Sequence, residues 1–300
     1  MTATRREILW GIAAAAASRG PAPGAAPLRY AICNETFQNL DFPAACRTAR
    51  KAGYAGLEIA PATLGADPPA VTLAQRVELR MAMASEGLEY VGLHSLLTGP
   101  RGLHVTAADG ATRRRSWDYL RRLVDLSGDL GGGVMVFGSG KQRAAATGVT
   151  AEAAAGWFRE GLAALAPAAR ERGVTILIEP LSPEFTNVVN TLAEAVAVVE
   201  AIAHPAVQTM FDTHNGVAEK LPHGELIKKY RRHIRHIHVN EMDGRHPGAG
   251  DYDFADLLRA LREITYRGWV SVEVFDFSPG GERIAEEAMR RLRRAESQSK

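Results

Sequence analysis

The sequence has little that would place it in a specialised class of protein. It contains only two cysteines, Cys33 and Cys46, too few for a dense disulfide framework or a four-cysteine zinc site. Its formal net charge is only +2, so the composition does not indicate a protein that binds nucleic acid or a membrane surface. No segment beyond the first thirty residues is long and apolar enough to predict a transmembrane helix. The absences leave an ordinary globular chain with a hydrophobic content of 46%, either a monomer or a homo-oligomer.

The first 27 residues have the composition of an export signal. Arg5 and Arg6 precede an alanine-rich apolar run that ends near Ala17, and small residues follow it as far as Ala26. Paired arginines before a short apolar stretch and a small-residue tail are typical of twin-arginine signals. The run is shorter than the about 20 apolar residues that a membrane-spanning helix needs. We therefore expect an exported, periplasmic protein; the alternative is a disordered or weakly helical tail on a cytoplasmic one.

From residue 28 onward, short apolar runs alternate with longer amphipathic stretches. Several of the runs are rich in valine and isoleucine, and near-continuous apolarity is typical of strands that are covered on both faces. The expected strands are residues 28–34, 56–60, 90–94, 133–138, 174–179, 207–212, 234–239 and 269–275.

Residues typical of helix boundaries stand between these runs. Starts are expected at or near Asp41, Thr72, Thr112, Thr150, Thr191, Pro222 and Asp253, and a last helix at 281–294. Pro167 should kink or break its helix. The residues expected to end helices in a left-handed conformation are Gly53, Gly87, Gly131, Gly173 and Gly268.

Eight strand–helix units in about 270 residues predict a (β/α)₈ barrel over residues 28–300. A doubly wound sheet is the alternative, but no glycine fingerprint follows the first strand. No linker divides the chain, which favours a single domain. The longest insertion, residues 96–109, follows the third strand and is a candidate active-site loop, because such loops lie at the carboxyl face of the barrel.

The last four expected strands end in polar side chains. These are Glu179, Asp212, His238 and Glu273. Because strand side chains alternate, the residues two positions earlier should also point into the barrel. Those inward residues are Leu177, Met210, His236 and Ser271, and the residues expected to face the helices are Ile178, Phe211, Ile237 and Val272.

Three carboxylates at one end of a barrel repel one another. Two like charges about 4 Å apart cost on the order of 4 kcal/mol at an effective dielectric near 20. A divalent cation removes this repulsion, and carboxylates with one imidazole suit Mn, Mg or Co, and also Zn. The sequence therefore predicts one divalent metal ion bound by Glu179, Asp212, His238 and Glu273.

The same four strand ends resemble the metal site of the xylose-isomerase-like sugar isomerases and epimerases, in particular the ketose 3-epimerases. The segments 179–191 and 238–250 also resemble those that follow strands five and seven in that family, including Pro247-Gly248-Ala249-Gly250. The resemblance covers residues 28–295. It implies a small sugar substrate, the four metal ligands above, and Glu179 and Glu273 as the two acid/base groups.

The substrate contacts of the family match less well. Phe185 stands where the ketose epimerases usually have a glutamate, with Glu184 one residue earlier, and Asn215 stands where they have a histidine, with His214 beside it. The expected arginine appears one residue late, as Arg245.

The residues taken as candidate substrate contacts are Glu58, His94, His214 and Arg245. His94 is alternatively a second-metal contact or a core histidine. Lys141 and Arg143, in a glycine-containing loop after strand four, either hold an anionic group or belong to a solvated basic loop.

The chemistry expected from this set is proton transfer next to a carbonyl through an ene-diolate. Return of the proton to the opposite face of the same carbon gives epimerisation, and return to the neighbouring carbon gives isomerisation. A metal-dependent lyase or dehydratase acting on an oxidised sugar or cyclitol is the main alternative. An apurinic endonuclease is disfavoured because strand four ends without a histidine, and a non-catalytic sugar-binding protein would not keep two free carboxylates at a metal.

The twin-arginine interpretation is tested by changing both arginines to lysine. We expect the parent chain to be exported and the Arg5→Lys/Arg6→Lys chain to stay inside the cell, because the paired arginines are what the export receptor reads. Cell fractionation and immunoblotting measure the distribution. Equal export of both chains, or retention of the parent, would contradict the signal.

Overall fold

Eight parallel strands form a closed barrel in which each strand pairs with the next along the chain and β1 pairs with β8. The structure, a computed structural model, describes residues 27–299. The strands are β1 (Arg29–Cys33), β2 (Gly56–Ile59), β3 (Glu89–Leu93), β4 (Gly133–Phe137), β5 (Val174–Ile178), β6 (Val207–Asp212), β7 (Ile234–Val239) and β8 (Trp269–Val272). The predicted strands and fold are thereby confirmed. The proposed export signal lies outside the described residues.

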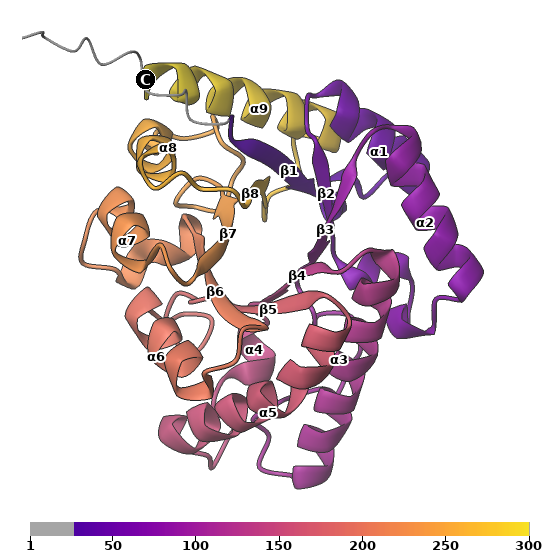
Figure 1. The fold of residues 1–300 in the computed structure, drawn as a ribbon, viewed down its shortest axis with the longest axis vertical. Coiled ribbons are helices and arrows are strands. Elements are labelled where there is room, and N and C mark those ends of the chain that lie inside the picture. Colours follow the sequence, from indigo (N-terminus) through magenta and orange to yellow (C-terminus); the bar gives the residue numbers. More distant parts are fainter. Residues whose placement is uncertain (1–26, 300) are drawn as a thin grey trace, which may run out of the picture.

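The helices surround the barrel as an outer ring (Figure 1). They are α1 (Phe42–Lys51), α2 (Leu73–Ser85), α3 (Gly110–Leu130), α5 (Ala151–Glu171), α6 (Leu192–Ile202), α7 (His223–Tyr230), α8 (Phe254–Glu263) and α9 (Gly281–Gln298). The short α4 (Gly140–Arg143) lies inside this ring, directly after β4. Four short 3₁₀ helices are η1 (Asn34–Phe37), η2 (Pro61–Leu64), η3 (Pro68–Ala70) and η4 (His214–Ala218). Within residues 27–299, no helix combines the length and the apolarity that crossing a membrane requires.

Most of the predicted helix starts are confirmed by their capping bonds. The side chains of Asp41, Thr150 and Thr191 accept hydrogen bonds from backbone N–H groups of the first turn. Thr72 forms a reciprocal capping box with Gln75, an arrangement that satisfies two N–H groups of the helix end.

The predicted boundaries at Thr112 and Gly268 are wrong, and Pro167 does not break its helix. Asp109, not Thr112, caps α3, because its carboxylate accepts from the backbone N–H groups of Ala111 and Thr112. Helix α5 continues through Pro167 to Glu171. After α8 the left-handed residue is Thr265, at φ 51°, rather than Gly268.

Glycine is required at position 268 for a reason other than a left-handed backbone conformation. A Cβ at this position would lie 2.6 Å from the carbonyl oxygen of Arg235, so glycine permits a close backbone approach beside β7. The last helix also extends to Gln298, beyond the predicted end.

The strand alternation separates two apolar regions. Ile178, Phe211, Ile237 and Val272 belong to the main core between strands and helices, as predicted. Leu177 and Met210 pack with Val136 in a small separate cluster. Each fully buried aliphatic side chain contributes roughly 1.5–3 kcal/mol, so this alternation holds the register that aims the strand-end residues.

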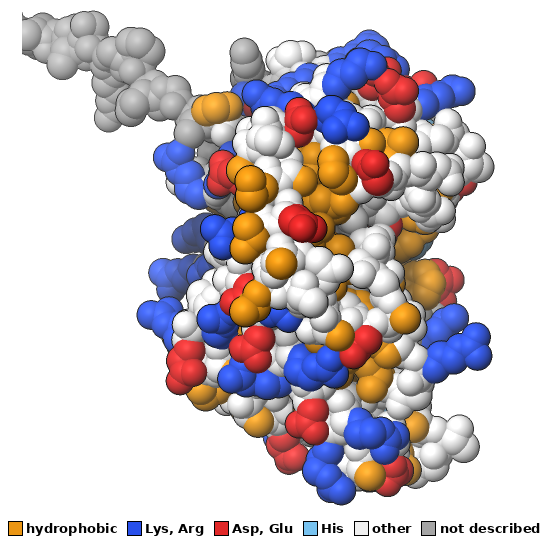
Figure 2. All heavy atoms as spheres, turned by 90° about the vertical axis from the view of Figure 1, so that its right-hand side faces the viewer, with side chains coloured by type: hydrophobic (Ala, Val, Ile, Leu, Met, Phe, Trp, Pro, Cys, Tyr) orange, Lys and Arg blue, Asp and Glu red, His pale blue; other side chains and the backbone are white. Residues whose placement is uncertain are grey.

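The outer surface carries hydrophobic side chains among charged ones on the side of the barrel that α1 and α2 cover (Figure 2). On α2, Leu73, Val77 and Met81 are exposed at a spacing of four residues, so they share one face of the helix. The predicted homo-oligomer would need an apolar face of this kind, and it stays a prediction.

Candidate metal centre and active site

The four predicted ligands meet at the carboxyl end of the barrel. Glu179 directly follows β5, Asp212 ends β6, His238 lies near the end of β7, and Glu273 directly follows β8. Asp212 and His238 are register partners in neighbouring strands. One ligand atom from each of the four lies within 4.8 Å of the others. The parallel strands end at the same face of the barrel, so residues up to 94 positions apart in the sequence form one compact group of metal-ligand atoms.

His238 is the centre of this group. Its Nδ1 lies 2.9 Å from Oε2 of Glu273, 3.7 Å from Oδ2 of Asp212 and 3.8 Å from Oε1 of Glu179. The same nitrogen is buried and makes no hydrogen bond of acceptable geometry. A buried nitrogen that faces three carboxylates without a partner is an incomplete site, because buried polar atoms are nearly always satisfied.

The electrostatics of the group are unfavourable without a cation. Burial, together with the neighbouring charges of Glu179 and Glu273, raises the pKa of Asp212 well above its ordinary value. Burial likewise raises the pKa of Glu179. For His238, burial favours the neutral ring, but the carboxylates of Glu273 and Glu58 outweigh it and raise the pKa. Such a site demands positive charge, and three carboxylates with one imidazole suit a divalent metal ion.

Two asparagines orient Asp212. Its Oδ1 accepts a hydrogen bond of 2.9 Å from the backbone N–H of Asn215, and its Oδ2 accepts one of 3.2 Å from Nδ2 of Asn240. Both asparagines are buried. In the sequence Asn215 is notable only as a departure from the family pattern, and Asn240 was not predicted as a site residue. The local signal was the position of Asn240 two residues after His238 on the same strand end.

A cavity of about 670 Å³ opens over the ligand group. Of the four ligands, Glu179 and Glu273 line this cavity. His214 lines it too, and the His214 ring lies 5.9 Å from the ring of Phe185 and 5.3 Å from that of Phe275. Asp212 and His238 are not among the lining residues, so the two glutamates alone combine ligand position with access to a bound molecule.

The other predicted substrate contacts lie differently. Glu58 and His94 are fully buried beneath the mouth. Arg245 pairs with Asp243 at 2.7 Å, and Asp243, rather than Arg245, lines the cavity. These three contacts stay predictions, and the geometry places only His214 directly at the cavity wall.

A second cavity of about 650 Å³ adjoins the first and shares Ser95, Thr98 and Phe275 with it. Glu35 lines this second cavity, and its Oε2 lies 3.0 Å from Nε2 of His94. Burial favours neutral His94, but the neighbouring carboxylates, Glu35 first, outweigh it and raise the pKa to about 9. Glu35, which follows β1 in the short 3₁₀ helix η1, was not predicted as a site residue.

Arg143 does not belong to a solvated basic loop, and it is not among the residues that line the cavity. Its side chain is fully buried, and the guanidinium donates to the carbonyl oxygens of Phe137, Glu179 and Val189 at 2.7, 2.7 and 3.1 Å. Burial lowers its pKa to about 10, which still leaves it charged at neutral pH. The predicted anion contact is therefore wrong for Arg143. Lys141, its neighbour, is exposed and lines the cavity.

The comparisons with known proteins agree with this geometry. The model of the xylose isomerase-like TIM barrel family matches residues 46–295. The chain therefore belongs to the xylose isomerase-like TIM barrel family.

Curated relatives of the chain are named as epimerases. One is a D-psicose 3-epimerase of Agrobacterium fabrum, 34% identical over 116 residues, which make up 39% of this chain and 40% of that protein. Another is a fructoselysine 3-epimerase of Shigella flexneri, 24% identical over 85% of this chain and 94% of that protein.

Among solved structures, a D-psicose 3-epimerase from Clostridium cellulolyticum superposes with a TM-score of 0.78. It is 21% identical, over 90% of this chain and 99% of that one. At this level of identity the likeness shows the fold alone.

The role of Arg143 predicts a specific loss of stability. We expect Arg143→Met to lower the free energy of unfolding by roughly 2–4 kcal/mol, because charge-assisted hydrogen bonds to three buried carbonyls are lost. Lys141→Met removes the same charge from an exposed position two residues away and should change the free energy of unfolding by less than about 0.5 kcal/mol. Urea unfolding of both variants measures the difference. Equal effects of the two changes would show that the buried bonds of Arg143 contribute nothing.

Proposed function

We propose that this protein is a metal-dependent sugar epimerase or isomerase that moves a proton next to a carbonyl. The observation that carries the proposal is the unpartnered Nδ1 of His238, which faces three buried carboxylates under a cavity that two of them line. Membership of a family whose curated relatives are epimerases supports the same reaction class.

The residues present fit a divalent metal ion. Glu179, Asp212, His238 and Glu273 would hold it, with Mn, Mg or Co preferred by the oxygen-rich set and Zn also suited. When bound, the ion supplies Lewis-acid stabilisation of the negative charge that develops on the sugar oxygens. Its positive charge would also relieve the repulsion from Glu179 and Glu273 that, together with burial, raises the pKa of Asp212.

Glu179 and Glu273 are the proposed acid and base. Both line the cavity and come from different strands, so they can approach a sugar carbon from different sides. One carboxylate removes the proton and the other returns it to the opposite face. Asp212 lies deeper and already accepts hydrogen bonds on both oxygens, which suits a residue that only holds the metal.

The proposed substrate is a small sugar or keto-sugar. Phe185 and Phe275 flank His214 at the cavity wall, and exposed aromatic faces of this kind pack against the C–H faces of a sugar. If the chain is exported, as its first residues predict, a neutral sugar or a sugar acid fits better than a sugar phosphate, because sugar phosphates are mainly intracellular.

A substrate panel in deuterated buffer tests the function. The purified protein is incubated with ketoses, aldoses and keto-sugars, with Mn²⁺ and again after thorough chelation. We expect a recovered epimer or isomer that carries solvent deuterium at the reacting carbon, and no conversion by the chelated protein until metal is restored. Loss of water from the sugar would identify a lyase instead, and full conversion after chelation would contradict metal dependence.

The two glutamates are separated from Asp212 by conservative changes. Glu→Gln keeps an oxygen that can reach the ion but removes the base, so Glu179→Gln and Glu273→Gln should retain metal while turnover falls by at least ~10²–10⁴-fold. Asp212→Asn should weaken metal binding first, with activity partly restored by excess metal. Metal content and turnover are measured for all three. A Glu→Gln variant that keeps both metal and near-normal turnover would eliminate that residue as the base.

A further inference from the structure

One of the four proposed ligands, His238, is bonded to a carboxylate for which the proposed reaction has no use, and that carboxylate also binds His236. Glu58 on β2 and His236 and His238 on β7 are all fully buried. Oε2 of Glu58 lies 2.8 Å from Nε2 of His236, and its two oxygens lie 3.1 and 3.2 Å from Nε2 of His238. Because a carboxylate can only accept, both imidazoles donate an N–H to this one side chain.

The two ring nitrogens of His238 therefore face different groups. Nε2 donates to Glu58, while Nδ1 points to Glu179, Asp212 and Glu273 without a hydrogen bond. A histidine binds a metal as the neutral ring, and a neutral ring that donates from one nitrogen presents the lone pair of the other. In the metal-bound state the bond to Glu58 therefore selects Nδ1 as the ligand atom.

We propose that Glu58 is the positioning residue of the metal centre: it fixes His238 with Nε2 protonated and Nδ1 directed at the ion. The proposal rests on the ligand set proposed above. It replaces the predicted contact between Glu58 and the substrate, because the Glu58 side chain is fully buried and lines neither cavity of the barrel mouth.

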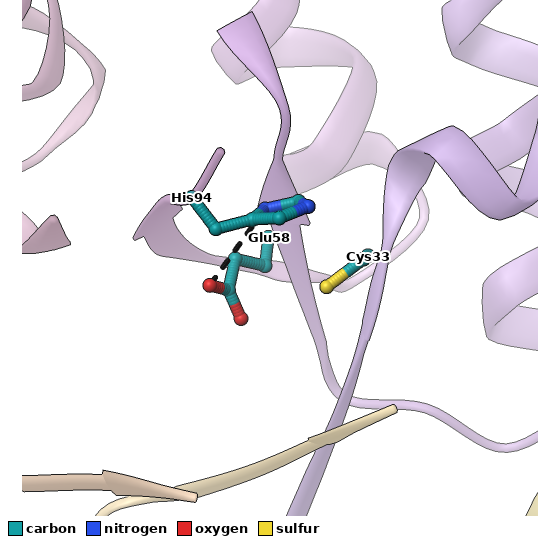
Figure 3. A group of neighbouring side chains, drawn as sticks. All are labelled: Cys33, Glu58 and His94. Carbon is teal, nitrogen blue, oxygen red and sulfur yellow. Dashed lines mark ion pairs between the residues drawn. The ribbon is translucent and has the colours of Figure 1, made fainter. Parts of the chain in front are cut away.

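The surroundings of Glu58 support a positioning role rather than a second metal site. Figure 3 shows His94 and Cys33 near Glu58, and Nδ1 of His94 lies 3.7 Å from Oε1 of Glu58. A metal there would need the thiolate of Cys33, but burial, with Glu58 and Glu273 nearby, raises the pKa of that thiol well above its ordinary value. The oxygens of Glu58 are, moreover, already engaged by two histidines.

Removing the Glu58 carboxylate should weaken metal binding while leaving every ligand in place. In Glu58→Gln one acceptor oxygen remains for two imidazole N–H groups, and the amide N–H₂ that replaces the other oxygen repels one of them. Loss of an outer carboxylate of this kind typically costs 10–100-fold in metal affinity. Glu58→Asp keeps the charge on a shorter side chain and should recover part of that loss.

The test measures the dissociation constant for Zn²⁺ and Mn²⁺ by competition with a chromophoric chelator, on the full chain. The matched control is Glu241→Gln, which alters another buried carboxylate. That carboxylate accepts from the backbone N–H groups of Gly248 and Tyr252, and its hydrogen bonds do not involve a proposed ligand. We expect a 10–100-fold weaker constant for Glu58→Gln and less than a 3-fold change for the control, with unfolding curves confirming that both variants fold.

A second readout follows the His238 ring itself. With ¹⁵N-histidine labelling and the diamagnetic Zn²⁺ protein, Nε2 of His238 should appear protonated and Nδ1 metal-bound, and the Nε2–H signal should shift or exchange faster in Glu58→Gln. The signal is assigned by its loss in His238→Gln.

The outcomes separate this proposal from the function on which it rests. A parent chain that binds no metal would overturn the ligand set. If the parent binds metal and Glu58→Gln binds it equally well, only the role of Glu58 is overturned. The same holds if Nδ1 of His238 is protonated in the metal-bound parent. Equal weakening by Glu58→Gln and Glu241→Gln would assign the effect to general destabilisation, and would also overturn it.

Discussion

The repulsion among Glu179, Asp212 and Glu273 is the constraint around which the barrel mouth is organised. One oxygen from each lies within 4.8 Å of the others, and the three residues are at most 5% exposed. Buried like charges at such distances cost several kcal/mol unless a cation compensates them. The structure concentrates this charge where a ligand can reach two of the three carboxylates.

The residues around the three carboxylates form successive contacts with this negative charge. His238 stands in the middle of the carboxylates, Glu58 holds its far nitrogen, and His94 faces Glu35, Glu58 and Glu273. The cation of Arg143 lies behind Glu179, bound to the carbonyl of that residue. His238, Glu58, His94 and Arg143 are fully buried, so their charges act in a low dielectric, where electrostatic interactions are stronger than in water.

Depth within the mouth divides the ligands into two kinds. Glu179 and Glu273 come just after their strands, where the chain leaves the barrel, and they border the cavity. Asp212 and His238 lie within β6 and β7 and are held by Asn215, Asn240 and Glu58. Residues fixed from several sides suit the holding of an ion, whereas residues at a free edge suit proton transfer, which needs contact with the substrate.

The local pattern of the sequence determined the barrel and the four strand-end residues. Both follow from short-range features that neighbouring residues reveal directly. These are apolar runs of strand length, capping residues such as Asp41 and Thr72, and the alternation around Leu177 and Ile178. Only the tertiary structure decided which side chains meet across the barrel. The contact between Glu58 and His238 joins residues 180 positions apart, and the burial of Arg143 against three carbonyls depends on loops packed from β4 and β5. Such contacts depend on barrel closure and strand register, which no local pattern encodes. Residues of the same type therefore acquire different roles according to the side chains and backbone groups that the fold packs against them.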